Sequence, residues 1–357
     1  EGENSNFISG RKCRLRALST PLRAQSCPRV LARTVALRAR RLLPTRQNLP
    51  RQGNPIYSRD LSASVPLPNQ PTRGSTEFLS VFRAHADPAG TMTFARFMAL
   101  ALYDPAVGYY RRLRRRIGHG PGTDFFTASS SGPLFGELVA AGCVSLLGDA
   151  DPRDYSFVEI GVEPGPPGQS ATSHSTLAGV EHPFGELRTI DFGKPIELNG
   201  KCVVFSNELF DAQPFHRFVF RRGAWREWGV QLRDEALNLL EIPVSTPAVF
   251  LPEQGQEGYT IDAPVAARDL AVQIATQSWT GLFVAFDYGK SWRELTEVTP
   301  GGTARAYSRH RLSNDLLARP GEQDLTCHVC WDWLSAALVQ QGFDAPAIES
   351  QEAFLIH

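Results

Sequence analysis

The sequence predicts an α/β fold built on a parallel or mixed β-sheet. Short apolar segments typical of buried strands recur between residues 155 and 286, and segments with helical periodicity lie between and around them. Three of the apolar segments run directly into loops that carry Gly, Asp or Glu. Ligand sites of α/β sheets form beyond the carboxyl ends of the strands, so we expect the functional site at these loops.

The composition fits a large globular core. Hydrophobic residues make up 42% of the 357 residues, and the formal net charge is +0. No apolar run reaches the roughly 18 residues that a transmembrane helix needs, so we expect no membrane span. The six Cys do not indicate a secreted disulfide framework, which favours a reducing compartment and a cytoplasmic location.

Residues 1–75 are predicted to be a basic arm outside the folded domain. Residues 11–59 hold twelve Arg and one Lys, with no Asp or Glu and no sustained periodicity. The arm is interpreted as a disordered or non-native extension, as a transit peptide that would direct the chain to the mitochondrial matrix, or as a nucleic-acid-binding segment. Few aromatic residues accompany the Arg residues, so we expect no base stacking and no nucleic-acid partner.

The domain predicted over residues 76–357 begins with a helical cap, residues 76–150. Apolar residues share one helical face in residues 77–82 and again in residues 94–102, where Thr93 can serve as the N-cap. The dipeptide Asp104-Pro105 ends the second helix. A third helix is expected over residues 133–147, because Pro133 suits a first helical turn.

The α/β core with its insertions is predicted over residues 151–357. Residues 215–220 and 225–230 are expected to pair through a turn at Arg222-Gly223. Helices are expected at residues 263–278 and 331–341. The remaining strands are predicted at residues 155–160, 201–205, 282–286 and 353–356.

The first candidate site follows the strand at residues 155–160. Glu159 and Gly161 lie where this strand enters a loop rich in Gly and Pro. Glycine lets the backbone approach a nucleoside closely, and the N-terminus of the next helix can face its polar groups. Glycines after a strand are often a simple turn, so the spacing alone leaves both interpretations open.

The second candidate site follows the strand at residues 201–205. Ser206, Asn207, Glu208 and Asp211 would lie at the carboxyl end of this strand. Two carboxylates and an amide there could hold a cationic or polar substrate. The alternative is a helix N-terminus in which Ser206 or Asn207 is the cap and the acids occupy the first turn.

A series of motifs then identifies a family. In chain order they occupy residues 101–105 and 108–110, 124–128, 134–137, 159–161, 206–211, 287–289, 302–307 and 323–329. In this order the sequence resembles the MidA family of class I S-adenosyl-L-methionine (SAM)-dependent methyltransferases. The resemblance covers roughly residues 93–357.

The resemblance implies a Rossmann-like class I methyltransferase sheet with added helical N-terminal and substrate-recognition elements, and SAM as the cofactor. Mitochondrial members methylate arginine on a subunit of a respiratory complex, which implies a protein substrate of that kind. Its residues fall into three groups. The catalytic group is Asn207, Glu208 and Asp211; the cofactor-binding group is Asp124, Phe125, Thr127, Glu159, Gly161, Glu163 and Gly165; the substrate-side group is Asp287, Tyr288, Arg305, Tyr307, His310 and His328.

Two features depart from the usual pattern of class I enzymes. Glu163 replaces the second glycine of the loop, and neighbouring prolines lack N–H donors. The stretch from Glu159 to Ser206 is short, because each βαβ unit takes roughly 30 residues. No acid clearly takes the place that grips the ribose; Asp191 and Glu181 are the candidates. An inactive relative that binds a partner as an assembly factor is therefore the alternative function.

No metal site is predicted. Cys327 and Cys330 form a single CxxC, whereas a structural zinc site needs four ligands.

Overall fold

The computed structural model describes residues 34–41, 74–112, 116, 123–124, 132–163, 174–245 and 248–356. The chain divides into two units, residues 1–32 and 33–357, and all of the described residues belong to the second.

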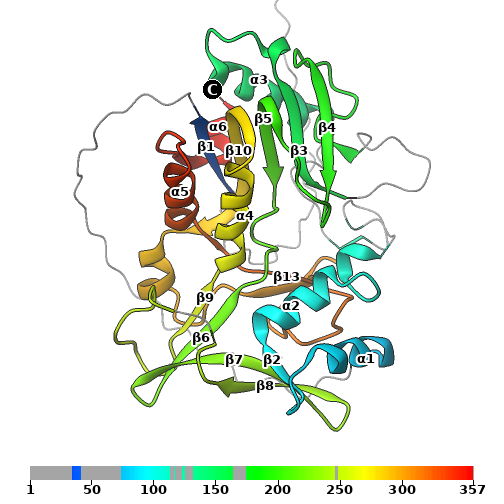
Figure 1. The fold of residues 1–357 in the computed structure, drawn as a ribbon, viewed down its shortest axis with the longest axis vertical. Coiled ribbons are helices and arrows are strands. Elements are labelled where there is room, and N and C mark those ends of the chain that lie inside the picture. Colours follow the sequence, from blue (N-terminus) through cyan, green and yellow to red (C-terminus); the bar gives the residue numbers. More distant parts are fainter. Residues whose placement is uncertain are drawn as a thin grey trace, which may run out of the picture. The chain divides into compact units, whose positions relative to one another are not determined.

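The main sheet of this second unit has the strand order β15-β1-β10-β5-β3-β4 (Figure 1). Four neighbouring strands run parallel: β4 (Glu186–Asp191), β3 (Ser156–Val162), β5 (Asn199–Asn207) and β10 (Ser278–Lys290). The short β14 (Val329–Cys330) pairs in parallel with the end of β10. The predicted α/β fold is confirmed, and the three loops that follow β3, β5 and β10 share one edge of the sheet.

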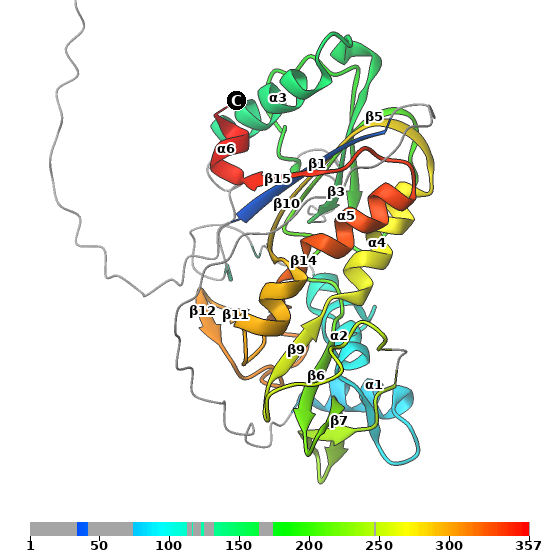
Figure 2. The same ribbon diagram turned by 90° about the vertical axis from the view of Figure 1, so that its left-hand side faces the viewer.

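Helices cover both faces of this sheet (Figures 1 and 2). α4 (Val265–Ala275) and α5 (Trp331–Gln340) pack on one face, where Val204 and Phe283 point. α3 (Pro133–Leu147) and α6 (Gln351–Leu355) pack on the other face, where Phe205 and Phe286 point. Because strand side chains alternate between faces, strands covered on both sides read as continuous apolar runs.

β1 (Thr34–Arg41) lies within the segment expected to be an arm. It pairs antiparallel with β10 along its whole length and with β15 (Ala347–Ser350) over residues 35–38. The expected boundary at residue 75 did not anticipate this strand, because an Arg-rich segment without clear alternation gives no strand signal. Residues 34–41 are thus built into the interior of the sheet.

Two element predictions need correction. The strand predicted at residues 353–356 is wrong: these residues overlap α6, whose N-cap Ser350 accepts a hydrogen bond from the amide of Ala353. The helix predicted over residues 263–278 is shorter at both ends. Its first residue belongs to β9 (Thr260–Ala263), and Ser278 opens β10.

The connections between the first parallel strands are short. Residues 192–198 carry the chain from β4 back to β5, across β3, without a helix. Parallel connections usually take a dozen or more residues. The described part of the connection from β3 to β4, residues 174–185, also holds no α-helix. This agrees with the shortness noted in the sequence.

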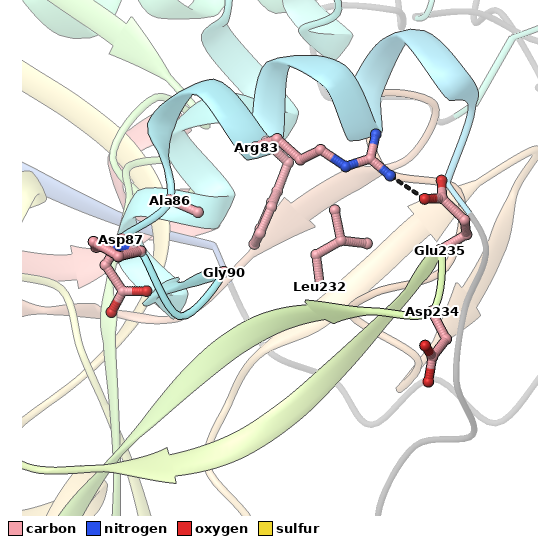
Figure 3. Close-up of a pocket in the computed structure, with 9 residues that line it drawn as sticks. Arg83, Ala86, Asp87, Gly90, Leu232, Asp234 and Glu235 are labelled. Carbon is pink, nitrogen blue, oxygen red and sulfur yellow. Dashed lines mark hydrogen bonds and ion pairs between the residues drawn. The ribbon is translucent and has the colours of Figure 1, made fainter.

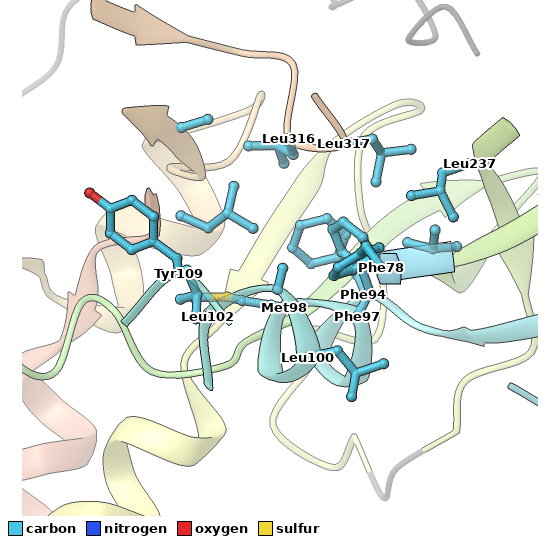
Figure 4. Packing of buried hydrophobic residues seen from close by; sticks show 14 of the residues in the cluster. Phe78, Phe94, Phe97, Met98, Leu100, Leu102, Tyr109, Leu237, Leu316 and Leu317 are labelled. Atoms are coloured by element: carbon cyan, nitrogen blue, oxygen red, sulfur yellow. The ribbon is translucent and has the colours of Figure 1, made fainter. Parts of the chain in front are cut away.

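A second layer of strands and helices forms its own core. A five-stranded sheet contains β2 (Thr91–Thr93), β6 (His216–Arg221), β7 (Ala224–Arg233), β8 (Ala236–Ile242) and β9. The hairpin β6–β7 turns at Arg222-Gly223, as predicted. α1 (Thr76–His85) and α2 (Phe94–Tyr103) bury Phe78, Phe94 and Phe97 in this core (Figure 4).

The N-cap prediction for α2 is confirmed, since Thr93 Oγ1 accepts a hydrogen bond from the amide of Arg96 at 3.2 Å. Two short 3-10 helices are η1 (Tyr109–Arg111), which follows α2, and η3 (Pro152–Asp154), which precedes β3. A short π-helix, η5 (Glu294–Val298), follows β10.

A small three-stranded sheet completes the fold. It has the order β12-β11-β13, with β11 (Arg305–Ser308), β12 (Arg311–Ser313) and β13 (Asp324–Thr326). Ala306 and Leu325 join the core of α1 and α2, which links this sheet to the helical elements.

Candidate functional site

The carboxyl ends of β3, β5 and β10 bring the predicted site loops together. Ile160 is the register partner of Ser206, and Asn207 is the register partner of Phe286. The residues that follow, Gly161 and Asp287 among them, therefore meet at one edge of the sheet. This is the position at which α/β proteins bind ligands.

Gly161 has a backbone that other residues rarely adopt. Its φ is +85°, and a Cβ at this position would lie 2.8 Å from Leu209 Cδ1. The strand register also shifts between Ile160 and Val162. A glycine is needed here both for the left-handed conformation and for the close contact with the loop after β5.

Glu159 is buried and fully engaged by the chain. Its Oε2 accepts hydrogen bonds from Ser175 Oγ (2.6 Å) and the Thr176 amide (2.7 Å), and its Oε1 accepts one from Thr176 Oγ1 (2.6 Å). Burial raises the pKa of Glu159, and these hydrogen bonds oppose that shift. Glu159 thus fixes the returning segment against β3.

Glu163, directly after β3, pairs with a buried cation. Arg116 Nη1 lies 3.4 Å from Glu163 Oε1, and the Arg116 side chain is only 1% exposed. Burial raises the pKa of Glu163, whereas the charge of Arg116 lowers it. Sequence reasoning missed Arg116, because one Arg in a loop of several carries no signal of burial.

Asp287 organises the loop after β5. It accepts hydrogen bonds from the amides of Phe210 (2.7 Å), Asp211 (3.2 Å) and Tyr288 (2.9 Å), and it is fully buried. Burial raises its pKa to about 7. The helix-cap alternative for this loop is not what the structure has, since no helix follows β5; the turn is held by Asp287 instead.

Glu208 lies in this turn with a φ of +52°, a conformation that costs a non-glycine residue about 1–2 kcal/mol. Burial raises the pKa of Glu208 to about 8, and the charges of Asp287 and Asp324 add to the shift. Burial also raises the pKa of Asp211, with Asp287, Glu208 and Asp324 contributing. Strain at such a residue is typical of functional sites.

The acidic cluster of Glu208, Asp211 and Asp324 has no ion pair with a cation in the described part of the chain. Asp324, on β13, is 6% exposed, and burial raises its pKa to about 7. Asp324 belongs to the motif at residues 323–329, but no role was predicted for it. Its burial beside the loop after β5 is a tertiary feature that local sequence does not reveal.

Two polar atoms at the end of β5 lack hydrogen-bond partners in the residues that the structure describes. They are Ser206 Oγ and Asn207 Oδ1, and both are buried. A buried acceptor without a donor costs free energy, so these atoms point to a ligand with hydrogen-bonding groups at this edge.

Asp124, a predicted cofactor-binding residue, forms hydrogen bonds with the turn that contains His310, a predicted substrate-side residue. Its Oδ2 accepts a hydrogen bond from Tyr109 Oη (2.6 Å), and its Oδ1 accepts one from the Arg309 amide (2.9 Å). Its backbone carbonyl accepts a hydrogen bond from the His310 amide (2.7 Å), and His310 Nε2 lies 3.1 Å from Thr123 Oγ1. Asp124 therefore holds the β11–β12 turn, in which both central residues have positive φ.

The other substrate-side residues are more dispersed. Tyr307 is opposite Asp324 across β11 and β13. Arg305 donates to the carbonyl of Ala304 at 2.6 Å. His328 is half-buried, its Nδ1 has no partner among the described residues, and burial lowers its pKa to about 4. Tyr288 follows Asp287 on β10 and is half-buried.

Three predicted cofactor-binding residues, Phe125, Thr127 and Gly165, lie outside the described residues.

In the part of the chain that the structure describes, no group of three His, Cys, Asp or Glu could hold a metal ion. Cys327 and Cys330 are both buried there, and burial raises the pKa of each thiol. No helix among the described residues is long and apolar enough to cross a membrane.

A separate surface pocket of about 310 Å³ lies between α1 and the β7–β8 turn (Figure 3). Arg83 and Glu235 form an ion pair across it, and Asp87 and Asp234 also line it. None of the predicted site residues contributes to this pocket, so we do not assign the function to it.

Comparison with known proteins agrees with this geometry. Residues 173–348 match the family model described as S-adenosyl-L-methionine-dependent methyltransferase. The zebrafish (Danio rerio) mitochondrial protein arginine methyltransferase NDUFAF7 is 26% identical over 303 residues, which are 69% of this chain and 68% of that protein. Its human (Homo sapiens) counterpart is 24% identical over 298 residues, covering 69% of this chain and 65% of that one.

The chain spans about two thirds of the length of these curated relatives. A crystal structure of a Burkholderia thailandensis protein bound to S-adenosyl-homocysteine has a similar fold. It has a TM-score of 0.62 and 23% sequence identity, and the match covers 78% of this chain and 80% of that chain.

Proposed function

We propose that this chain is a SAM-dependent methyltransferase that transfers a methyl group to a cationic nitrogen, in particular to protein arginine; the family model that matches residues 173–348 supports methyl transfer from SAM. The acidic cluster at the sheet edge supports the proposal that the methyl acceptor is positively charged. The name of the relatives, protein arginine methyltransferase, supports arginine as its chemical class.

The described residues fit a SAM molecule at the end of β3. Gly161 lets the backbone approach the ligand, and the partnerless Asn207 Oδ1 can accept a hydrogen bond from an amino group. Asp191 ends β4, next to β3, where an acid can hold ribose hydroxyls. Of the two acids considered from the sequence, Asp191 has this position.

When bound, SAM supplies a methyl group attached to a positively charged sulfur. Glu208 and Asp211 would bind the acceptor guanidinium through charge-assisted hydrogen bonds and hold its nitrogen in line with the methyl carbon. As the nitrogen lone pair forms the new N–C bond, the C–S bonding pair stays on sulfur. The nitrogen then loses a proton to the Glu208 carboxylate, whose raised pKa makes it a competent acceptor.

The observation that carries the proposal is Glu208 itself. It is a half-buried carboxylate without a cationic partner among the described residues, held in a strained turn beside Gly161.

The test is SAM binding to the full chain by calorimetry, followed by transfer of labelled methyl to arginine-containing peptides. We expect micromolar binding, which corresponds to about −8 kcal/mol. Gly161→Arg should abolish binding. Gly223→Arg is the matched control, because Gly223 also has positive φ but faces open space in a hairpin turn. Equal binding by both variants would contradict the assigned site.

A second candidate function is that of a partner-binding assembly factor without catalysis. The observation in its favour is the seven-residue connection of residues 192–198, which leaves no helix between β4 and β5. Absence of SAM binding by a protein with a cooperative unfolding transition would favour this function over methyl transfer.

We also propose a mitochondrial location and a protein partner. The curated relatives are named mitochondrial, which supports the transit-peptide alternative and gives no support to the cytoplasmic prediction. A respiratory-complex subunit as the substrate stays a prediction, and co-purification of the tagged full chain from mitochondria would test it.

A further inference from the structure

The small sheet β12-β11-β13 presents two side chains toward the acidic cluster. Tyr307 and Asp324 are direct partners across the antiparallel pair β11–β13, so they lie on the same face of this sheet. Asp324 is 6% exposed. The small sheet therefore adds a carboxylate and an aromatic ring to a site otherwise built from the loops of the main sheet.

The Asp324 carboxylate is only half satisfied. Tyr110 Oη and the Leu325 amide both donate to Oδ1, each at 2.9 Å. No hydrogen bond reaches Oδ2 from the residues that the structure describes. Oδ2 is not one of the fully buried atoms without a partner, so it is accessible and can accept a hydrogen bond from a ligand that supplies N–H groups.

Contacts fix β13 against the turn that carries Glu208. The Cys327 amide donates to the Asp211 carbonyl at 3.0 Å. Tyr103 Oη donates to the Ala212 carbonyl at 2.9 Å, and the Tyr103 ring stacks on Tyr110 with 5.5 Å between centroids. The charge of Asp324 also raises the pKa values of Glu208 and Asp211.

We propose that Asp324, with Tyr307 beside it, makes the acceptor pocket selective for a planar guanidinium over an ammonium group. This inference rests on the proposed function. A guanidinium has five N–H donors in a rigid fork, so it can donate to Glu208 on one side and to Asp324 on the other. Its flat face can also stack on the Tyr307 ring. An ammonium group is a compact point charge and gains less from carboxylates on two sides.

Tyr110 is a positioning residue in this arrangement. Its hydroxyl holds Oδ1 of Asp324 and so leaves Oδ2 for the ligand. The ring is itself fixed by contacts with Tyr103 and with Phe192, whose centroid lies 4.4 Å from that of Tyr110; these two rings also contact each other. Loss of the hydroxyl should leave the Asp324 carboxylate less well oriented without removing its charge.

The experiment measures binding of Nα-acetyl-arginine amide and Nα-acetyl-lysine amide to the full chain saturated with S-adenosyl-homocysteine. We expect the wild-type chain to bind the arginine probe at least about tenfold more tightly, as two charge-assisted contacts would allow. Asp324→Asn should reduce this ratio to about threefold or less. Tyr110→Phe should give an intermediate ratio, and the exposed Asp344→Asn should leave it unchanged.

Affinity for S-adenosyl-homocysteine serves as the folding control for every variant, and the Tyr110→Phe result stands if Asp324→Asn does not fold. A wild-type ratio near one, or an unchanged ratio in both Asp324→Asn and Tyr110→Phe, would overturn the inference.

The proposed function is tested separately by methyl transfer to an arginine peptide. If no methyl is transferred while the ratio depends on Asp324, the methyltransferase proposal fails and the guanidinium preference stands.

Discussion

Glu208 combines three properties, each of which costs free energy. It has positive φ, it is half-buried, and other acids surround it. Asp287 makes this possible, since its three backbone hydrogen bonds fix the turn. Asp287 therefore holds the backbone of the turn, whereas Glu208 is the carboxylate that we propose to bind the ligand.

Glu208→Gln should lower methyl transfer by about 10²–10⁴-fold, the usual contribution of a positioned proton acceptor. Only the ionised form accepts a proton, so the wild-type rate should rise with pH up to about 8, the raised pKa, and level off above it. The rate measured at saturating SAM between pH 6 and pH 9.5 checks this. A variant with full activity, or an unchanged pH profile, would contradict the role.

Gly161→Ala should weaken SAM binding and destabilise the fold by more than the about 1–2 kcal/mol of a left-handed alanine, because its Cβ would meet Leu209 at 2.8 Å. Gly200→Ala is the matched control, since Gly200 has a φ of +69° but open space around it. Urea unfolding and calorimetry of both variants would measure the difference. Equal effects would mean that the contact with Leu209 does not matter.

At the scale of elements, the sequence predicted the type of most of them. Phe94 to Tyr103 shows helical periodicity with Thr93 as its cap, and buried strands such as β5 are continuous apolar runs. The two failures differ in cause. The helix at residues 351–355 has a local signal, the N-cap Ser350, which the strand prediction overlooked. β1 takes its structure from partners far along the chain, and local propensity does not contain that information.

The same limit applies to the site. Glu208 and Asp211 were predicted because they follow a strand directly, a local signal. Arg116 and Asp324 were not assigned roles, because only the packing of distant loops buries them beside Glu163 and Glu208.

The β11–β12 turn depends on Asp124. Asp124→Ala removes acceptors for Tyr109 Oη and the Arg309 amide, and it should cost about 1–3 kcal/mol of unfolding free energy. Hydrogen exchange of the Arg309 amide should accelerate, whereas Tyr109→Phe should leave that amide protected. If the amide exchanges at the wild-type rate in Asp124→Ala, Asp124 does not hold the turn.

At the scale of the whole molecule, the buried acids should make stability fall as pH rises. Glu208, Asp287 and Asp324 have raised pKa values of about 8, 7 and 7, against 4.5, 3.8 and 3.8 for unperturbed groups. The folded protein thus keeps protons that the unfolded chain releases. The contribution of these three groups to the free energy of unfolding is fully present below pH 4 and is lost progressively up to about pH 8.

Urea unfolding of the wild-type chain from pH 5 to pH 8 measures this trend. The double variant Glu208→Gln with Asp324→Asn should show a flatter dependence. Stability that rises with pH over this range would show that these carboxylates are ionised in the folded protein.

Removing residues 1–41 should destabilise the second unit, because β10 loses its neighbour along all of β1 and β15 loses its only described strand partner. Removing residues 1–32, which form the other unit, is the matched control and should leave the thermal midpoint nearly unchanged. Similar midpoints for both truncations would mean that β1 contributes little to the sheet.

The position of β1 also bears on the order of folding. β1, at residues 34–41, pairs with β10 at residues 278–290 and with β15 at residues 347–350, which both follow it at a long distance in the sequence. Contacts so distant in sequence slow folding, because the long loop must close before the contacts compensate for its entropy. Because β1 precedes both partners in the chain, it has no strand partner until β10 has been synthesised, and its second edge stays unpaired until β15 follows. We expect refolding to be slow and sensitive to protein concentration, as it is for proteins that expose unpaired strand edges.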